Sequence, residues 1–290
     1  MRILITADLH YDIARSRKPA RQLAERACAK GGDVLVLLGD TAGRDLDTFA
    51  EALRMFEAFK GRKLLVPGNH CLWCRPGEDS IERYEQLLPR LAEAEGFEVL
   101  DYKPVILGEV GLAGSIGWYD YSFREEYLGI PMAFYEAKVS PGAAARLDEH
   151  TELFEAYREQ LTERQLEIVT RWMDGRFVKL GMSDDAFVAK LAKKLEGDLA
   201  ELSASVERIA VFLHHLPFRT LVPKERPDKF AFAAAYMGSE RFGEVLMGCP
   251  KVAAVYCGHS HWRVRQRIGH MDVVNVGSTY RDKILEILDW

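Results

Sequence analysis

The stretch from Val34 to Arg44, VLVLLGDTAGR, constrains the fold more than any other part of the chain. Its first five residues form an unbroken apolar run, which predicts a strand buried on both faces. The run ends in Gly39-Asp40, so a carboxylate stands at the carboxyl end of a buried strand, the edge of open α/β sheets where ligands bind. An unpaired charge there would be costly, and we therefore expect Asp40 to have a cation or a strong hydrogen-bond donor as its partner.

Four other apolar segments end in the same way, in polar residues of the types that bind metals. These residues are Asp8 and His10 after ILITA, Asn69 and His70 after KLLVPG, His214 and His215 after VFL, and His259 and His261 after VAAVYCG. Asp8 and His10 are spaced i, i+2, so in an extended strand both side chains would leave the same face. Five strand ends that bring aspartate, asparagine and histidine to one edge indicate a two-metal site.

The order of predicted elements indicates one α/β domain over residues 1–290. Strands at 2–7, 34–38 and 63–66 alternate with helices at 19–30, which we expect Pro19 to open, and at 45–60, as in right-handed βαβ units. Hairpins are predicted at 103–115 and 262–276, and further strands at 208–213, 252–257 and 283–288. Residues from about 121 to 207 are charged and helical in period, and we interpret them as a helical insertion that is either a lid or an ordinary solvated layer. The loop at 217–237 is too long for a simple connection, and we expect it to line the site.

Composition disfavours several classes of partner. The net charge of −5 and the pI near 6.0 argue against nucleic acid, because a protein that grips phosphate backbones usually carries a basic excess. No apolar run approaches the roughly 20 residues of a membrane span, so we expect no membrane partner. We also expect no signal peptide, because the first strand begins at Arg2. An odd number of cysteines, five, fits a reducing cytoplasm and no disulfide framework.

The polar motifs, taken in order, resemble those of the calcineurin-like metallophosphoesterase superfamily, and the match runs from Asp8 to His261. The motifs are Asp8-Leu9-His10, Gly39-Asp40 with Arg44, Gly68-Asn69-His70, His214-His215-Leu216-Pro217 and Gly258-His259-Ser260-His261. The resemblance implies a four-layer αββα sandwich of two mixed β-sheets flanked by helices. It also implies a dinuclear metal centre that hydrolyses small phosphate mono- or diesters.

The resemblance assigns a role to each ligand position. Asp8, His10 and His261 would hold one divalent ion, and Asn69, His214 and His259 would hold the second, with Asp40 bridging both. A carboxylate has two oxygens and can span ions about 3.5–4 Å apart, and the two cations would lower the pKa of a bridging water. Imidazole ligands suit Mn, Fe, Zn or Co, of which we favour Mn.

Two further positions match groups that act on the substrate. His70 matches the family's general acid for the leaving oxygen, and Arg44 matches a phosphate-contacting arginine, although a surface charge at a helix start is the alternative for Arg44. The family pattern makes His214 the ligand and leaves His215 as the alternative. The chain departs from the family at Gly43 and Cys71, where carboxylates often stand that could orient the acid histidine, so the sequence does not identify what orients His70.

Other residues near the motifs have two interpretations each. Cys71 and Cys74 form a CxxC, for which two packed thiols are favoured over zinc binding or redox sensing. Arg263, Arg265 and Arg267 alternate on one strand, and a solvated outer face is favoured over a contact with an anionic substrate. The aromatic residues Trp118, Tyr119 and Tyr121 belong either to the site rim or to the core.

Three functions are compatible with these features of the sequence. The first is a cytoplasmic dinuclear-metal phosphoesterase. The second is a metal-dependent nuclease of the same superfamily. The net negative charge of the chain disfavours it, and the strand that carries Arg263, Arg265 and Arg267 supports it. The third is a non-catalytic metal-binding scaffold, which is disfavoured because all seven ligand positions are filled.

Overall fold

The computed structural model describes residues 1–224 and 227–290, and its strands form two β-sheets that pack face to face. The first sheet has the strand order β11-β1-β2-β3-β4, and the second has the order β5-β6-β7-β8-β10-β9. The first consists of β1 (Arg2–Ala7), β2 (Val34–Leu38), β3 (Arg62–Val66), β4 (Glu98–Val99) and β11 (Glu286–Asp289). The second consists of β5 (Val105–Leu107), β6 (Val110–Ser115), β7 (Arg208–Leu213), β8 (Val252–Cys257), β9 (Val264–Ile268) and β10 (Met271–Asn275).

Both sheets are mixed, as the sequence predicts. The strands β1, β2, β3 and β4 run parallel, and β11 pairs antiparallel with β1. In the second sheet β6, β7, β8 and β10 run parallel, while β5 and β9 are antiparallel edge strands. Parallel strands point their carboxyl ends to the same edge, so the polar residues that follow them are gathered together.

The run at 34–38 is buried on both faces, as predicted. Val34, Val36 and Leu38 pack in the layer between the two sheets, together with residues of β1, β3, β6, β7, β8 and β10. Leu35 and Leu37 point the other way, into the layer beneath the helices. Alternate side chains of one strand therefore serve two apolar layers, which explains why the run contains no polar residue.

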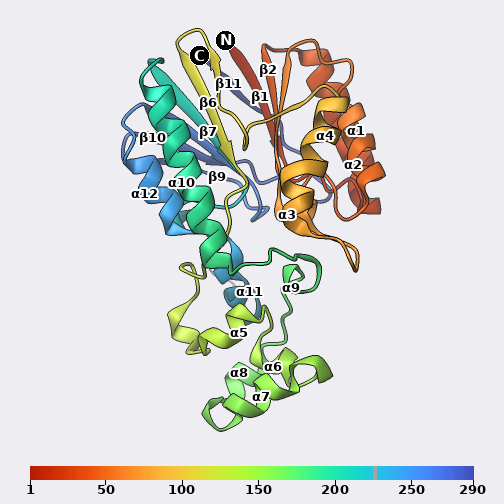
Figure 1. Cartoon of the computed structure of the whole chain (residues 1–290), viewed down its shortest axis with the longest axis vertical. Coiled ribbons are helices and arrows are strands. Elements are labelled where there is room, and N and C mark those ends of the chain that lie inside the picture. Colours follow the sequence, from red (N-terminus) through yellow and green to blue (C-terminus); the bar gives the residue numbers. More distant parts are fainter. Residues whose placement is uncertain (225–226) are drawn as a thin grey trace.

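Helices cover the outer face of each sheet, which completes the predicted α/β sandwich (Figure 1). The first sheet is flanked by α1 (Ala14–Lys30), α2 (Leu46–Arg54) and α4 (Leu88–Ala94), with the short α3 (Ser80–Glu82) near its edge, and the second by α10 (Asp184–Ser203) and α12 (Glu240–Met247). The prediction that Pro19 opens the first helix is wrong, because α1 begins at Ala14. A hydrogen bond fixes the first turn instead, because the hydroxyl of Ser16 donates to the carbonyl of Leu9.

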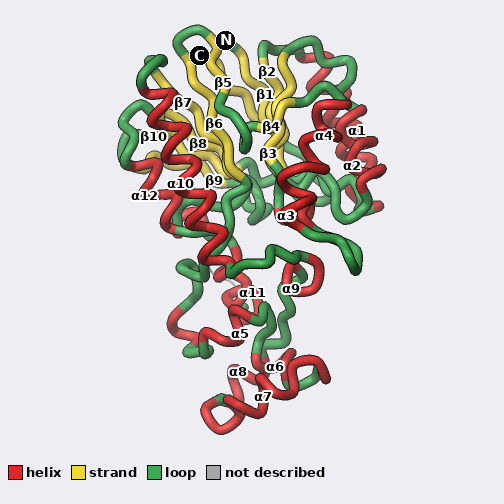
Figure 2. Tube along the Cα trace, viewed as in Figure 1, coloured by secondary structure: helices red, strands yellow, loops and turns green. Residues whose placement is uncertain are grey.

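Between β6 and α10 the chain leaves the sandwich and builds a region of short helices, which we call the projecting segment (residues 121–183). It contains α5 (Met132–Glu136), α6 (Pro141–Ala144), α7 (Thr151–Tyr157), α8 (Glu163–Glu167) and α9 (Asp174–Phe177). Figure 2 shows these helices beyond the ends of the strands. The last helix of the predicted insertion, α10, packs instead against β6 and β7.

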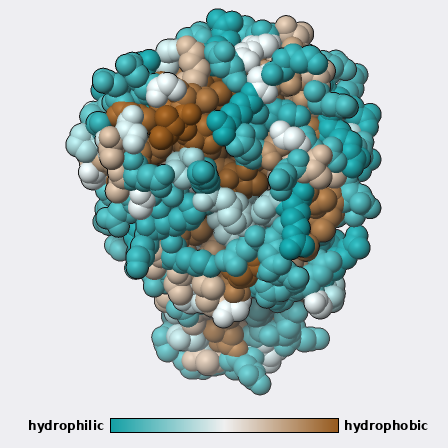
Figure 3. Space-filling model, turned by 45° about the horizontal axis from the view of Figure 1, so that its top comes forward, coloured by the Kyte–Doolittle hydropathy of each residue, from teal (hydrophilic) through white to brown (hydrophobic). Residues whose placement is uncertain are grey.

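The loop predicted to line the site contains α11 (Asp228–Ala233), and its residues 225 and 226 lie outside the described part of the chain. Hydrophilic side chains cover most of the face shown in Figure 3, and apolar ones gather in its upper part. Within the described residues, no helix combines the length and the hydropathy that crossing a bilayer requires.

Candidate metal centre

The structure brings all seven predicted ligand positions to one place, where the ends of the two sheets meet. The first sheet supplies Asp8 and His10 after β1, Asp40 after β2 and Asn69 after β3, while the second supplies His214 after β7 and His259 and His261 after β8. Among the described residues, three overlapping groups of side chains could hold a metal ion: Asp8-His10-His261, His10-Asp40-His70 and Asp40-His214-His259. Within each group the ligand atoms lie within 4.8 Å of one another. The first and the last contain only predicted ligands, and we call them the two sets.

Five of these seven residues have a left-handed backbone, which the sequence did not predict. The φ angles are 55° at Asp8, 43° at His10, 45° at Asp40, 67° at His259 and 54° at His261. The expectation of an extended backbone from Asp8 to His10 is therefore wrong. The left-handed region is unfavourable for residues with a Cβ and persists where surrounding contacts determine it. Here the amide of His10 donates to the Asp40 carbonyl at 2.7 Å, and the amide of His259 donates to the Asp8 carboxylate at 3.1 Å.

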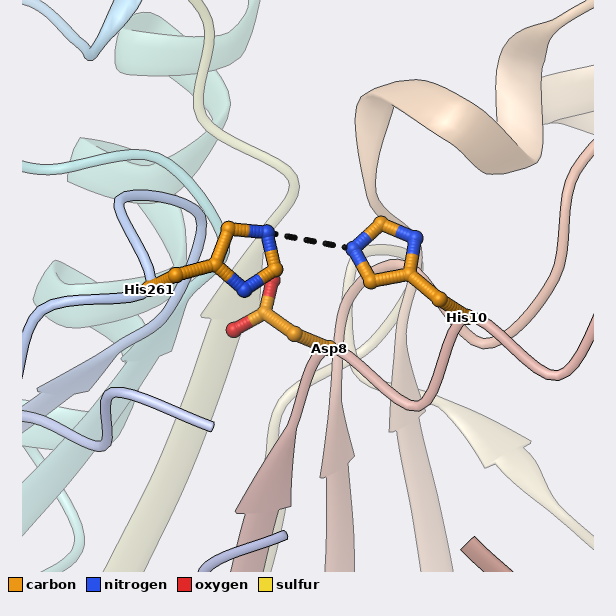
Figure 4. A group of neighbouring side chains, drawn as sticks. All are labelled: Asp8, His10 and His261. Carbon is orange, nitrogen blue, oxygen red and sulfur yellow. Dashed lines mark hydrogen bonds between the residues drawn. The ribbon is translucent and has the colours of Figure 1, made fainter. Parts of the chain in front are cut away.

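In the first set the imidazoles of His10 and His261 face each other, with the Asp8 carboxylate beside them (Figure 4). The two Nε2 atoms are 3.3 Å apart. Nδ1 of His261 lies 2.6 Å from the carbonyl oxygen of Ser278. A carbonyl only accepts, so Nδ1 carries the hydrogen and Nε2 turns its lone pair toward the centre.

In the second set Asn69, His259 and Asp40 converge on His214. Its Nε2 lies 3.2 Å from Oδ1 of Asn69 and 3.2 Å from Nδ1 of His259. Nε2 of His259 faces the Tyr236 carbonyl at 3.1 Å, which leaves the lone pair of its Nδ1 directed toward the centre.

Asp40 lies between the two sets, and each of its oxygens faces a different one. Oδ2 is 3.5 Å from Nε2 of His10, and Oδ1 is 3.4 Å from Nε2 of His214. The close approach depends on Gly68, because a Cβ there would lie 2.2 Å from Oδ1 of Asp40. One carboxylate thus reaches both sets, which is the position of a bridging ligand.

The electrostatics of the buried cluster fit divalent cations. Burial holds the pKa of His10 and of His259 well below the usual range, so both rings are neutral and able to bind metal. Burial alone would raise the pKa of Asp40, but His214 and His70 outweigh it and hold that pKa well below its usual range. Burial raises the pKa of Asp8, a cost that a bound cation would remove. Nδ1 of His10 is also buried, and no group in the described part of the chain forms a hydrogen bond with it.

His70 lies beside the cluster, with Nε2 3.9 Å from Oδ2 of Asp40. Its side chain is 17% exposed. The ring stacks on the indole of Trp73, with a centroid distance of 3.7 Å and an interplanar angle of 23°. Trp73, which sequence analysis missed, therefore restricts the plane of His70. Its one sequence signal is its place four residues after Asn69.

The remaining candidates lie outside the two sets, and of these His215 is in contact with them, because its ring centroid lies 4.3 Å from that of His259. Arg44 is exposed and its guanidinium lies 4.5 Å from the centroid of the Phe177 ring, and its role with phosphate stays a prediction. His215 turns Nδ1 to the carbonyl of Ile116 at 3.0 Å, and burial lowers its pKa to about 3. Cys71 and Cys74 are buried free thiols. Among the described residues neither joins a group of metal-binding side chains.

The three arginines of β9 and its flank, and the aromatic residues that follow β6, also lie outside the two sets. Arg263 and Arg265 pair with Glu286, and Arg267 pairs with Asp272, which fits the outer-face interpretation. The aromatic residues belong to the core, where Trp118 and Tyr119 are 0% exposed.

A cavity of about 430 Å³ opens onto the cluster. Asp40, Asn69 and His70 form its floor, and the projecting segment contributes a wall through Arg171, Trp172, Met173 and Asp174. The loop at 217–237 contributes Phe230, Ala233 and Met237. No motif in the sequence pointed to Asp174, which lies far from every strand end.

The family model described as calcineurin-like phosphoesterase matches residues 1–263. Among solved structures, a phosphopantetheinyl hydrolase from Mycobacterium tuberculosis is similar with a TM-score of 0.70 and 17% identity, over 96% of this chain and 89% of that one. A dimetal phosphatase from Danio rerio is similar with a TM-score of 0.53 and 18% identity, over 99% of this chain and 91% of that one. Among curated protein sequences, none is similar enough to this chain to count as a match.

Proposed function

This chain belongs to the calcineurin-like phosphoesterase family, and on that premise we propose that it is a dinuclear-metal-dependent enzyme that hydrolyses small phosphate mono- or diesters. The observation that carries the proposal is the position of Asp40. Its two oxygens face two different sets of metal-binding side chains, at 3.5 Å and 3.4 Å from the nearest imidazole nitrogens. A buried carboxylate shared in this way is the arrangement that a pair of cations requires.

The donor set restricts which cations would fit. Asp8, His10 and His261 would hold one ion, Asn69, His214 and His259 the other, and Asp40 both. Imidazole, carboxylate and amide donors suit Mn, Fe, Zn or Co, and we favour Mn. When bound, two such ions supply positive charge at the phosphoryl group and lower the pKa of a water at the centre.

The chain's own residues orient the ligands and move the proton. The carbonyl groups of Ser278 and Tyr236 hold His261 and His259 in the tautomers that leave a lone pair toward the centre. His70, on the floor of the cavity, would donate a proton to the oxygen of the departing alcohol. The proposal includes a small phosphate ester as the partner and a cytoplasmic location, which the five free cysteines support.

Metal content and activity together test the proposal. Protein reconstituted with Mn²⁺ should bind two ions per chain, as measured by elemental analysis, and anomalous scattering should place both beside Asp40. A panel of phosphomonoesters and diesters, including a phosphopantetheine ester because of the structural neighbour, should contain a substrate. A single ion remote from Asp40 would contradict the dinuclear centre. Hydrolysis of oligonucleotides alone would favour the nuclease alternative, and two bound ions without any hydrolysis would favour the scaffold.

A further inference from the structure

His70 lacks the carboxylates that family members often place next to the acid histidine, because Gly43 and Cys71 occupy those positions. The described neighbourhood of the centre contains another carboxylate, that of Asp174, which comes from the projecting segment. Asp174 is the first residue of α9 and is 1% exposed. Its surroundings differ from those of an ordinary surface acid, because several hydrogen-bond donors converge on its carboxylate.

Asp174 accepts hydrogen bonds from four side chains. Oδ1 accepts from Nδ2 of Asn69 at 2.9 Å and from the indole nitrogen of Trp73 at 2.6 Å. Oδ2 accepts from the indole nitrogen of Trp172 at 2.8 Å and from the hydroxyl of Tyr119 at 3.0 Å. Nδ2 of Asn69 also lies 3.2 Å from Oδ2. None of these donors carries a formal charge, so the hydrogen bonds themselves must compensate the buried carboxylate.

The contact with Asn69 determines how its amide is oriented. Because Nδ2 donates to the carboxylate, Oδ1 points the other way, toward Nε2 of His214 at 3.2 Å. A flipped amide would place Oδ1 against the carboxylate, where two acceptors repel each other. Asp174 therefore selects the orientation in which the amide oxygen of Asn69 faces the centre.

The contact with Trp73 acts on His70. The indole nitrogen is held by Asp174, and the ring of the same indole stacks on His70 at 3.7 Å. A stacked ring restricts rotation of the imidazole about χ2, a torsion that is otherwise broad. The backbone supports the arrangement, because the amide of Cys74 donates to the carbonyl of Phe177 at 2.8 Å and so joins α9 to the segment that carries Trp73.

We propose that Asp174 is the positioning residue of this centre, which fixes the amide of Asn69 as a ligand and, through Trp73, the ring plane of His70. It acts on His70 through Trp73, whereas the space beside Gly43 is occupied by the carboxylate of Asp12. The inference rests on the proposed function, because it assigns Asn69 to a metal and His70 to proton transfer. It gives the projecting segment a part in the metal centre in addition to its contact with the cavity.

Metal binding by Asp174→Asn tests the first half without any need for turnover. Asparagine keeps the shape but offers one acceptor oxygen and brings an N–H₂ group toward donors. Titration of metal-free protein with Mn²⁺ in a calorimeter should show one of the two ions bound roughly 10- to 100-fold more weakly, the usual effect of losing a group that orients a ligand. The matched control is Tyr119→Phe, which removes one donor to Oδ2 and keeps the hydrogen bonds that Asn69 and Trp73 donate to Oδ1. Both ions should bind to it as in the wild type.

The dependence of turnover on the leaving group tests the second half. Trp73→Phe keeps an aromatic ring beside His70 but removes the N–H that Asp174 holds. Its kcat should fall at least tenfold for alkyl phosphates, which need a proton on the leaving oxygen, and much less for nitrophenyl phosphate. Tyr119→Phe should reproduce the wild-type ratio between these substrates.

The outcomes separate this inference from the proposed function. Wild-type protein that binds no Mn²⁺ would overturn both. Wild-type protein that binds two ions, with the same affinities in Asp174→Asn, would overturn the inference alone. Equal weakening of both ions, accompanied by a lower melting temperature, would also overturn it and assign Asp174 a general structural role. If Asp174→Asn does not fold, the comparison of Trp73→Phe with Tyr119→Phe decides, and equal leaving-group ratios in the two variants would refute the proposal.

Discussion

Substitution of Gly39 by alanine should impair metal binding and turnover, although it replaces none of the predicted metal ligands. Gly39 has φ 76°, and a Cβ at this position would lie 1.8 Å from Nδ1 of His214 and 2.3 Å from its Cγ. Ordinary contact begins at 3.4 Å, so the ring or the strand would have to move by about 1.6 Å. A ring displaced that far cannot keep its distances of 3.2 Å to Asn69 and 3.4 Å to Asp40.

The magnitude follows from two separate costs. The left-handed backbone costs alanine about 1–2 kcal/mol, and forcing a methyl group into a packed site adds about 1–3 kcal/mol. We therefore expect Gly39→Ala to lower the free energy of unfolding by about 2–5 kcal/mol. Because a misplacement of about 1 Å costs roughly 100-fold in rate, turnover should fall by at least that factor.

Gly108→Ala is the matched control. Gly108 has φ 60°, but a Cβ there would meet no atom within 4 Å, so this variant bears the backbone cost alone. Urea denaturation of the metal-free proteins measures the free energies of unfolding, and elemental analysis after reconstitution with Mn²⁺ counts the ions. If Gly39→Ala were no less stable than Gly108→Ala and still bound two ions, the contact between Gly39 and His214 would not matter and the reasoning would be refuted.

Three further predictions follow from the same structure. Asp40→Asn should bind at most one ion tightly, because the amide offers one good oxygen and no charge where two sets of ligands share a carboxylate. If elemental analysis found two ions and turnover were intact, Asp40 would not be a bridging ligand. His70→Ala should keep both ions, but its turnover should fall roughly 10²–10⁴-fold for alkyl phosphates and far less for nitrophenyl esters. Equal losses in the two kinetic assays would instead indicate that His70 binds the phosphate group. Burial raises the pKa of Asp101 from its ordinary value of 3.8 to about 7, so between these two pH values the folded chain retains a proton that the unfolded chain has lost. The free energy of unfolding therefore falls by roughly 4 kcal/mol as pH rises through this window. Asp101→Asn should remove this part of the pH dependence in urea denaturation at pH 4.5 and pH 8, and an unchanged difference between these two pH values would contradict the assignment.

Apolar strands with polar residues at their carboxyl ends predicted an α/β fold that gathers those residues at one edge, whereas the two-sheet sandwich and the seven ligand positions came from the resemblance to the family. An apolar run such as 34–38 must be buried on both faces, and parallel strands deliver the residues after them to the same edge. The residue types then restrict the chemistry, because Asp40 cannot be buried there without a partner. The first of these inferences uses only local composition and the general geometry of parallel sheets, and the second uses the order of the motifs along the chain.

The sequence could not predict the contacts that depend on the projecting segment. Asp174 accepts a hydrogen bond from Asn69, which lies 105 residues earlier in the sequence. A periodic pattern of residues cannot predict a contact between such distant positions. The left-handed backbone of Asp8 and His10 was missed because a motif spaced i, i+2 is also compatible with a strand. The start of α1 was missed because the polar residues from Ala14 to Lys18 show no helical period, although Ser16 is buried.

The division of the ligands between the two sheets has a consequence for how this protein acquires its cations. Asp8, His10, Asp40 and Asn69 belong to the first third of the chain, whereas His214, His259 and His261 join only when the second sheet docks. Neither half alone contains a complete donor set, so high-affinity loading must await assembly of the whole sandwich. Once bound, the ions would cross-link the two sheets, and mass action would add about 2.7 kcal/mol of global stability for each ion at a free ion concentration 100 times its Kd. A chelator added to the loaded protein should therefore loosen the whole fold and not the rim of the cavity alone.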